Sequence, residues 1–128
     1  MDARLDPKQA LGLDDGDAHV IRNAGGVVTD DAIRSLAISQ HLLGTEEIVL
    51  IQHTDCGMQK FTDDELAERL EEHAGEPPPF EIGSFHDLEH NLRDSLRALR
   101  ESRFLLKTDA VRGFVYEVET GRLREVSA

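Results

Sequence analysis

Hydrophobic positions along the chain follow two spacings, and each spacing predicts a different kind of element. Apolar residues three or four positions apart predict amphipathic helices over residues 29–44 and 85–102. The stripe of the second helix consists of Phe85, Leu88, Leu92, Leu96 and Leu99. A nearly continuous apolar run over residues 47–53 predicts a buried strand of the kind found in parallel sheets. Two alternating runs joined by Glu-Thr-Gly-Arg predict a β-hairpin over residues 111–126.

Capping residues mark where the helices begin and end. Thr29 is suited to the N-cap of the first helix, and Gly44 is suited to its end. A capping box of Thr62 and Glu65 predicts one more short helix, over residues 62–75. The prolines that follow it cannot continue a helix and indicate an extended connection.

The order of the elements along the chain indicates the fold class. Residues 18–26 predict a further short strand that runs into a glycine-rich turn, so strands and helices alternate. This alternation is typical of an α/β fold with a parallel central sheet flanked by helices, here with the C-terminal β-hairpin at one edge. A chain of 128 residues supports one modest core, and we expect a single domain over residues 1–128.

The charge balance narrows the range of partners. The chain has 14 Lys and Arg against 26 Asp and Glu, and the formal net charge of −12 argues against binding to nucleic acid or to an anionic membrane surface. This acidity fits an ordinary solvated surface, and adaptation to high salt is the alternative. No stretch has the length and apolarity of a membrane span, and the N-terminus lacks the features of a signal peptide. We therefore expect a cytoplasmic protein.

The strongest candidates for chemistry are His53 and Cys56, which follow the predicted strand over residues 47–53. Ligands of α/β sheets bind beyond the carboxyl ends of parallel strands, and neutral imidazole and thiolate are ligands that zinc prefers. A purely structural role for the pair is the alternative. Asp55 can cap the following turn, and Gly57 allows the backbone to come close to a ligand, but each residue also has an ordinary role in a turn. As the chain's one cysteine, Cys56 is a free thiol, a metal ligand or a nucleophile.

Several motifs resemble the β-class carbonic anhydrases in order and approximate spacing. They are MDAR at residues 1–4, HVIRNAGG at 19–26, RSLAIS at 34–39 and HTDCGM at 53–58. The segment VRGFVYEVETGRL at 111–123 is similar to the C-terminal hairpin of that family. The resemblance implies a β-carbonic-anhydrase-like fold whose first strand is missing here, and a homodimer or a higher assembly.

The resemblance also implies a zinc site and an enzymatic activity. His53 and Cys56 match the family's histidine and second cysteine ligands to Zn2+, and Asp2 and Arg4 match its Asp-x-Arg dyad. The implied activity is the reversible hydration of carbon dioxide to bicarbonate and a proton, because zinc makes a bound water acidic enough to ionise near neutral pH. In this scheme Asp2 orients the water and Arg4 keeps Asp2 ionised and in place.

One ligand implied by the resemblance falls outside the sequence. The family's first cysteine ligand corresponds to the position immediately before Met1. Either the start was assigned at an internal methionine of a longer protein, which we favour, or the chain is a truncated relative with an impaired site. In the second case Asp2 is a candidate substitute ligand. Two other functions stay open: a related hydrolase of carbon disulfide or carbonyl sulfide, and a truncated, metal-poor dimerisation or regulatory module.

Overall fold

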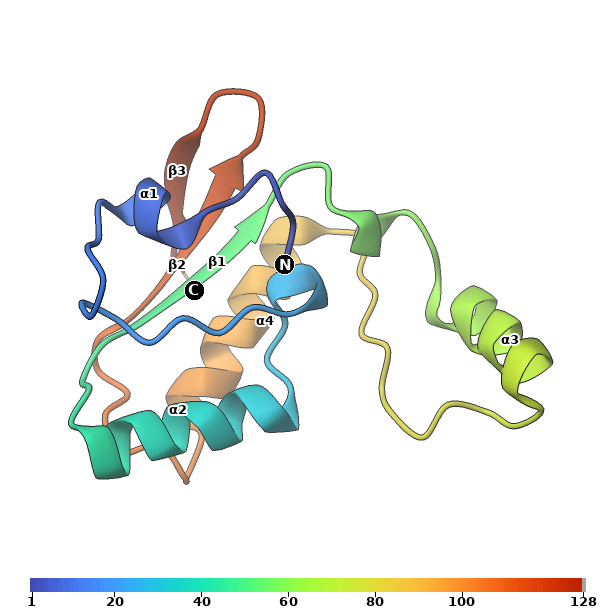
Figure 1. Ribbon diagram of the computed structural model, residues 1–128, viewed down its shortest axis with the longest axis horizontal. Coiled ribbons are helices and arrows are strands. Elements are labelled where there is room, and N and C mark those ends of the chain that lie inside the picture. Colours follow the sequence, from blue (N-terminus) through green and yellow to red (C-terminus); the bar gives the residue numbers. More distant parts are fainter. Residues whose placement is uncertain (128) are drawn as a thin grey trace.

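Three strands form the sheet in the computed structural model, which describes residues 1–127 (Figure 1). Strand β1 (Ile48–His53) pairs in parallel with β2 (Val111–Glu117), and β2 pairs antiparallel with β3 (Arg122–Val126). The α/β class, the parallel pair and the C-terminal hairpin are thereby confirmed. Because the strand order is β1-β2-β3, strand β2 is central and β1 lies at an edge of the sheet.

Four α-helices and two short 3-10 helices complete the described part of the chain. They are α1 (Pro7–Leu11), η1 (Ala24–Gly26), α2 (Asp30–Leu43), η2 (Gly57–Gln59), α3 (Asp63–Ala74) and α4 (Leu88–Glu101). The predicted caps are confirmed: the Thr29 hydroxyl accepts from the Ala32 amide, and Gly44 ends α2 in a left-handed conformation. The capping box of Thr62 and Glu65 begins α3.

The main core lies between α4 and one face of the sheet (Figure 1). It contains the fully buried Leu92, Leu96 and Leu99 of α4 and the buried Val111 and Val115 of β2. Burying each such side chain stabilises the fold by roughly 1.5 to 3 kcal/mol. Gly113 of β2 allows close packing, because a Cβ atom there would lie only 2.6 Å from Leu96 Cδ1.

The structure corrects three predictions and adds one element. Residues 18–23 form no strand: Val20 and Ile21 are 44% and 42% exposed and have no neighbouring strand to pack against. The last helix begins at Leu88 rather than at residue 85, because the side chain of Asp87 caps it by accepting from the His90 amide. Strand β1 is only partly buried, since it is an edge strand. Helix α1 was not predicted, and its five residues bury no side chain.

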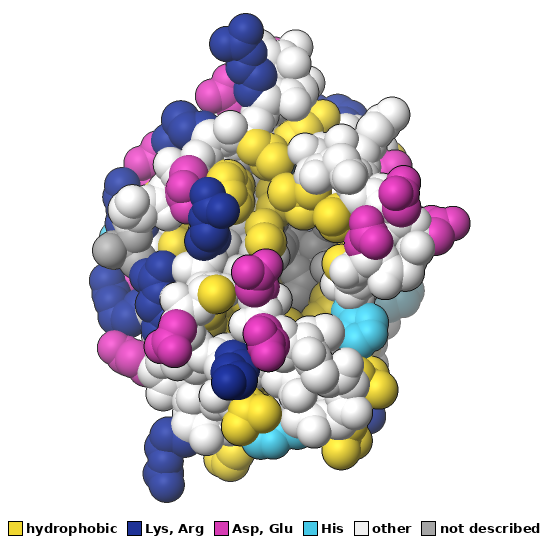
Figure 2. All heavy atoms as spheres, turned by 90° about the vertical axis from the view of Figure 1, so that its left-hand side faces the viewer, with side chains coloured by type: hydrophobic (Ala, Val, Ile, Leu, Met, Phe, Trp, Pro, Cys, Tyr) yellow, Lys and Arg dark blue, Asp and Glu magenta, His cyan; other side chains and the backbone are white. Residues whose placement is uncertain are grey.

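The unpaired edge of β1 borders a groove with a volume of about 700 Å3. One wall is the N-terminal segment up to residue 28, and the other is formed by β1 and α2. The groove is lined mainly by apolar side chains, among them Leu5, Leu11, Leu13, Val20, Ile21 and Val49. Figure 2, which views the molecule from this side, shows apolar side chains gathered around a hollow. An open strand edge beside apolar surface is a feature that proteins usually cover.

Residues 62–84, here called the arm, extend away from the sheet and carry α3 (Figure 1). Helix α3 has no buried residue. At the base of the arm, Phe85 packs with Met58 and Cys56 in a second, smaller cluster, and the Phe85 amide donates to the Met58 carbonyl. Within residues 1–127, none of the helices is both long and apolar enough to span a membrane.

Candidate metal centre and its ion-pair network

His53 ends strand β1 with its ring buried and its orientation fixed by the backbone. The side chain of His53 is 8% exposed, and its Nδ1 atom lies 2.7 Å from the Thr54 carbonyl oxygen. Since a carbonyl oxygen only accepts, Nδ1 donates this hydrogen bond, and Nε2 is the ring nitrogen that faces Asp2. Thr54 is itself held by the hairpin, because its hydroxyl accepts from the Val118 amide at 3.1 Å. The sheet thus presents an imidazole nitrogen able to bind a metal.

Cys56 lies three residues further on and is the N-cap residue of η2. Its residue exposure is 4%, and its neighbours are the apolar side chains of Met58 and Phe85. Gly25 closes this cluster from the other side, because a Cβ atom there would lie 2.9 Å from Met58 Cγ. The thiol is thus a buried group on the loop that follows the histidine.

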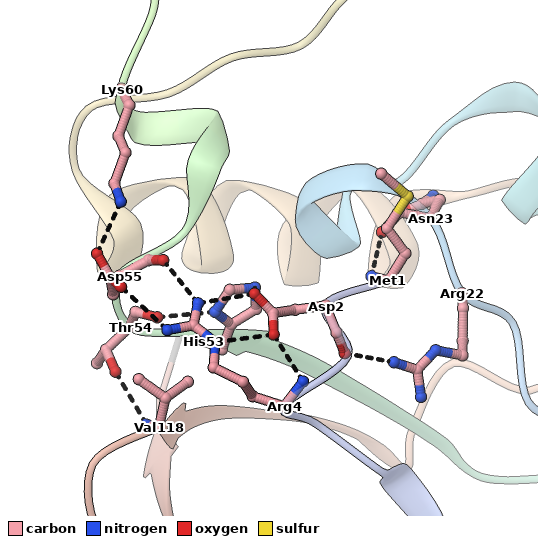
Figure 3. A network of polar contacts seen from close by, with 10 residues as sticks. All are labelled: Met1, Asp2, Arg4, Arg22, Asn23, His53, Thr54, Asp55, Lys60 and Val118. Atoms are coloured by element: carbon pink, nitrogen blue, oxygen red, sulfur yellow. Dashed lines mark hydrogen bonds and ion pairs between the residues drawn. The ribbon is translucent and has the colours of Figure 1, made fainter.

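Asp2 and Arg4 form the ion pair that the sequence predicted as a dyad (Figure 3). The guanidinium of Arg4 donates to both carboxylate oxygens of Asp2, from Nε at 2.9 Å and from NH2 at 2.7 Å. These hydrogen bonds hold the pKa of Asp2 well below its usual range and raise the pKa of Arg4. Asp2 Oδ2 lies 3.7 Å from Nε2 of His53, so the dyad adjoins the imidazole.

The segment around Arg22 and Asn23 fixes the position of the dyad. Arg22 donates to the Asp2 carbonyl at 2.7 Å, and the amino group of Met1 donates to the Asn23 carbonyl at 2.7 Å. The side chain of Asn23 bonds both the amide and the carbonyl of Val27 and so closes the turn through the two glycines of η1. The segment IRNAGG therefore lies against the Asp2–Arg4 pair and borders the candidate site.

Asp55 is a member of the network that sequence reasoning missed. Its carboxylate does not act as a turn cap: Oδ2 accepts from Arg4 NH1 at 3.0 Å, and Oδ1 lies 2.9 Å from Lys60 Nζ (Figure 3). The Asp55 carbonyl also accepts from Arg4 NH2, at 3.1 Å. Lys60 first, and then Arg4, lowers the pKa of Asp55. No signal in the sequence joins Arg4 to a residue 51 positions away, so only the fold brings them together.

The donor chemistry fits part of a zinc site. Nε2 of His53 and Sγ of Cys56 are ligands that zinc prefers, and structural sites of this metal have four ligands. Among residues 1–127, no group of three His, Cys, Asp or Glu side chains is arranged to hold a metal ion. The carboxylate of Asp2 is near but is engaged by Arg4. The residues present thus fit two positions of a tetrahedral site.

The remaining histidines lie elsewhere. His19, His41, His73, His86 and His90 are all exposed, as the sequence indicated. His41 bonds the Phe104 carbonyl, and His90 lies 3.2 Å from the Asp94 carboxylate. They are surface residues, and among residues 1–127 His53 is the one buried histidine.

The fold and the site define an α/β protein with a histidine and a cysteine beside an aspartate–arginine pair. The family model described as carbonic anhydrase matches residues 1–76, which is more than half of the chain. The chain is also 53% identical over 127 residues to β-carbonic anhydrase 1 of Mycobacterium tuberculosis, a match covering 99% of this chain and 78% of the relative. The chain therefore belongs to the β-carbonic anhydrase family.

Two further relatives show how far the similarity reaches. The crystal structure of a carbonic anhydrase from Streptococcus mutans superposes with a TM-score of 0.92 at 46% identity, covering 99% of this chain and 77% of that one. A carbon disulfide hydrolase of an Acidianus strain is 38% identical over 149 residues, covering 98% of this chain and 73% of the relative. The same fold and related sequences thus accompany two named activities.

Proposed function

We propose that the protein is a zinc-dependent carbonic anhydrase that hydrates carbon dioxide to bicarbonate and a proton. The observation that carries the proposal is the buried His53, whose Nε2 faces the carboxylate of Asp2 at 3.7 Å while Thr54 holds Nδ1. The relative from M. tuberculosis and the structure from S. mutans, both named carbonic anhydrases, support it.

Each residue of the site has a defined task in this proposal. His53 Nε2 and Cys56 Sγ would hold the metal, and Asp2 would either be a substitute third ligand or, where another residue completes the site, orient the water. When bound, zinc supplies the Lewis acidity that makes water reactive near neutral pH. Asp2 accepts a hydrogen bond from the water that attacks carbon dioxide. Because Arg4 keeps the pKa of Asp2 below its usual range, Asp2 remains ionised at neutral pH and orients this water rather than taking its proton.

The decisive experiment measures zinc content and carbon dioxide hydration in three proteins. They are the chain itself, a form with a cysteine inserted before Met1, and the Cys56→Ala variant of that inserted form. We expect the inserted cysteine to raise zinc content toward one ion per chain and to give hydration that Cys56→Ala abolishes. Stopped-flow measurement with a pH indicator follows the proton released. A zinc-loaded inserted form with no more hydration than its own Cys56→Ala variant would contradict the proposal.

Carbon disulfide hydrolysis is the second candidate activity. The observation that favours it is the similarity to the Acidianus carbon disulfide hydrolase, together with a TM-score of 0.86 to the apo form of such an enzyme at 36% identity. In this chain both activities would use the same residues and would differ in which molecule reaches them. Assaying one zinc-loaded preparation with carbon dioxide and with carbon disulfide, the latter followed by sulfide release, decides between them.

We extend the proposal to a homodimer of single-domain chains in the cytoplasm. The open edge of β1 and the apolar groove beside it support an assembly, because such a surface is usually covered. Light scattering coupled to size exclusion measures the mass in solution. A monomer across micromolar concentrations would contradict the dimer. A dimer with no zinc and no activity would favour a metal-poor dimerisation or regulatory module, which fits the absence of a three-ligand group among residues 1–127.

A further inference from the structure

We propose that Asp55 is a positioning residue of this site: with Lys60, it fixes the guanidinium of Arg4 and, through Arg4, the carboxylate of Asp2. The expected effect of Asp55 on kcat rests on the proposed hydration activity. Its expected effect on the orientation of Arg4 rests on geometry alone. Asp55 does not reach His53 through any hydrogen bond, so its effect passes through Arg4 (Figure 3).

The backbone conformation at Asp55 is the first observation. Asp55 has φ of +52°, the only positive φ of a non-glycine residue within residues 1–127. Left-handed backbone is unfavourable for residues with a Cβ atom, and aspartate is among those that tolerate it. With this conformation, both the carbonyl and the carboxylate of Asp55 accept from the same guanidinium. An uncommon conformation retained next to a candidate ligand motivates a hypothesis of function.

The way in which Arg4 is shared is the second observation. Its Nε and NH2 atoms donate to Asp2, and its NH1 and NH2 atoms donate to Asp55, so the planar guanidinium is fixed from two sides. Arg4 is 47% exposed and Asp2 is 21% exposed, so without the Asp55 carboxylate the NH1 end of the guanidinium faces solvent, and only the contacts with Asp2 and with the backbone carbonyl at position 55 remain. Lys60 holds the second carboxylate oxygen of Asp55 and fixes its rotamer. The loop that carries Cys56 therefore also sets the direction of the dyad.

Four variants separate positioning from folding. Asp55→Gly removes the carboxylate and suits the positive φ, so the fold is retained. Asp55→Asn keeps an oxygen acceptor in a residue that tolerates this backbone, and Lys60→Met removes only the outer contact. Asp94→Asn is the matched control, because Asp94 is similarly exposed and also bridges two basic groups, Arg97 at 3.0 Å and His90 at 3.2 Å.

Kinetic measurements on the zinc-loaded protein provide the first readout. We expect Asp55→Gly to lower kcat about 10- to 100-fold, the usual effect of removing a partner that orients a metal site, with KM unchanged. Asp55→Asn should recover part of the loss, Lys60→Met should cost less, and Asp94→Asn should leave kcat as it is. Equal zinc content and equal melting temperature across the set exclude a general structural defect. A wild-type kcat in Asp55→Gly would overturn the proposal.

NMR of the Arg4 side chain provides a readout that needs no activity. The Nε–H signal of Arg4, assigned by its loss in Arg4→Lys, should be sharp in the wild type and in Asp94→Asn and exchange-broadened in Asp55→Gly. An unchanged signal in Asp55→Gly would overturn the positioning role. A lost signal in a protein that hydrates no carbon dioxide would reject the proposed function and still support the positioning role.

Discussion

Gly26 of η1 packs closely against strand β1, which carries His53. Its φ is +59°, and a Cβ atom at this position would lie 2.7 Å from the backbone oxygen of Ile51, two residues before the histidine. Because the neighbour is backbone, it cannot move aside as a flexible side chain would. Gly26→Ala therefore combines a conformational cost with a steric one.

A matched variant, Gly44→Ala, separates the conformational part of the loss of stability from the steric part. The left-handed conformation costs an alanine about 1 to 2 kcal/mol, offset by about 0.4 to 1 kcal/mol because alanine loses less entropy on folding. Gly44→Ala has this cost alone, since φ is +78° and nothing lies within 4 Å of its Cβ position. Overpacking against Ile51 adds about 1 to 3 kcal/mol in Gly26→Ala. The expected losses are about 1 kcal/mol for Gly44→Ala and about 2 to 4 kcal/mol for Gly26→Ala.

Urea unfolding followed by circular dichroism gives both free energies of unfolding, measured at one protein concentration. The difference between the two variants isolates the contact with Ile51. Equal losses in Gly26→Ala and Gly44→Ala would refute the close approach of the turn to β1, and with it the account of how IRNAGG is held against the site.

Three further perturbations test other parts of the structure. Leu96→Ala should cost about 2 to 5 kcal/mol in urea unfolding, because Leu96 is fully buried; a loss under about 1 kcal/mol would show that α4 does not pack on β2 as described. Gln40→Leu should cost at least about 2 kcal/mol, since its side chain satisfies the amides of Leu106 and Lys107 and the Lys107 carbonyl, and Gln40→Glu should cost less. Ser84→Ala should raise the pKa of Asp63 toward 3.8 in a carboxyl NMR titration, because hydrogen bonds from Ser84 lower it. Since the folded-state pKa of Asp63 is depressed, its contribution to stability is present above pH 3.8 and is lost as the pH falls through the lowered pKa. An unshifted titration in Ser84→Ala would contradict this.

Local signals in the sequence were sufficient to predict most of the helices and strands. The caps at Thr29 and Thr62 are formed by side chains and amides three positions apart, so they are visible in the sequence alone. The short strand predicted within residues 18–26 was wrong, because its formation depends on a partner that is not local in the sequence. An apolar run forms a strand only where a neighbour supplies hydrogen bonds, and within residues 1–127 this segment has no strand beside it.

The candidate site was predictable only in part. His53 and Cys56 could be proposed from their spacing after a strand, and Asp2 and Arg4 from a family resemblance. The contacts of Asp55 could not be proposed, because they depend on a left-handed backbone angle and on where the N-terminal segment crosses the loop. Neither is encoded in a local pattern of residues.

The packing at the base of the arm determines the chemical accessibility of Cys56. Met58 and Phe85, which flank the arm, are among the side chains packed around the thiol, and α3 within the arm buries no residue. Segments with few buried contacts open at a lower free energy than the sheet core does. An opening of the arm that displaces Phe85 uncovers the thiol while the sheet remains folded. The rate at which Cys56 reacts with an alkylating reagent thus reports on the opening of the arm and not on global unfolding.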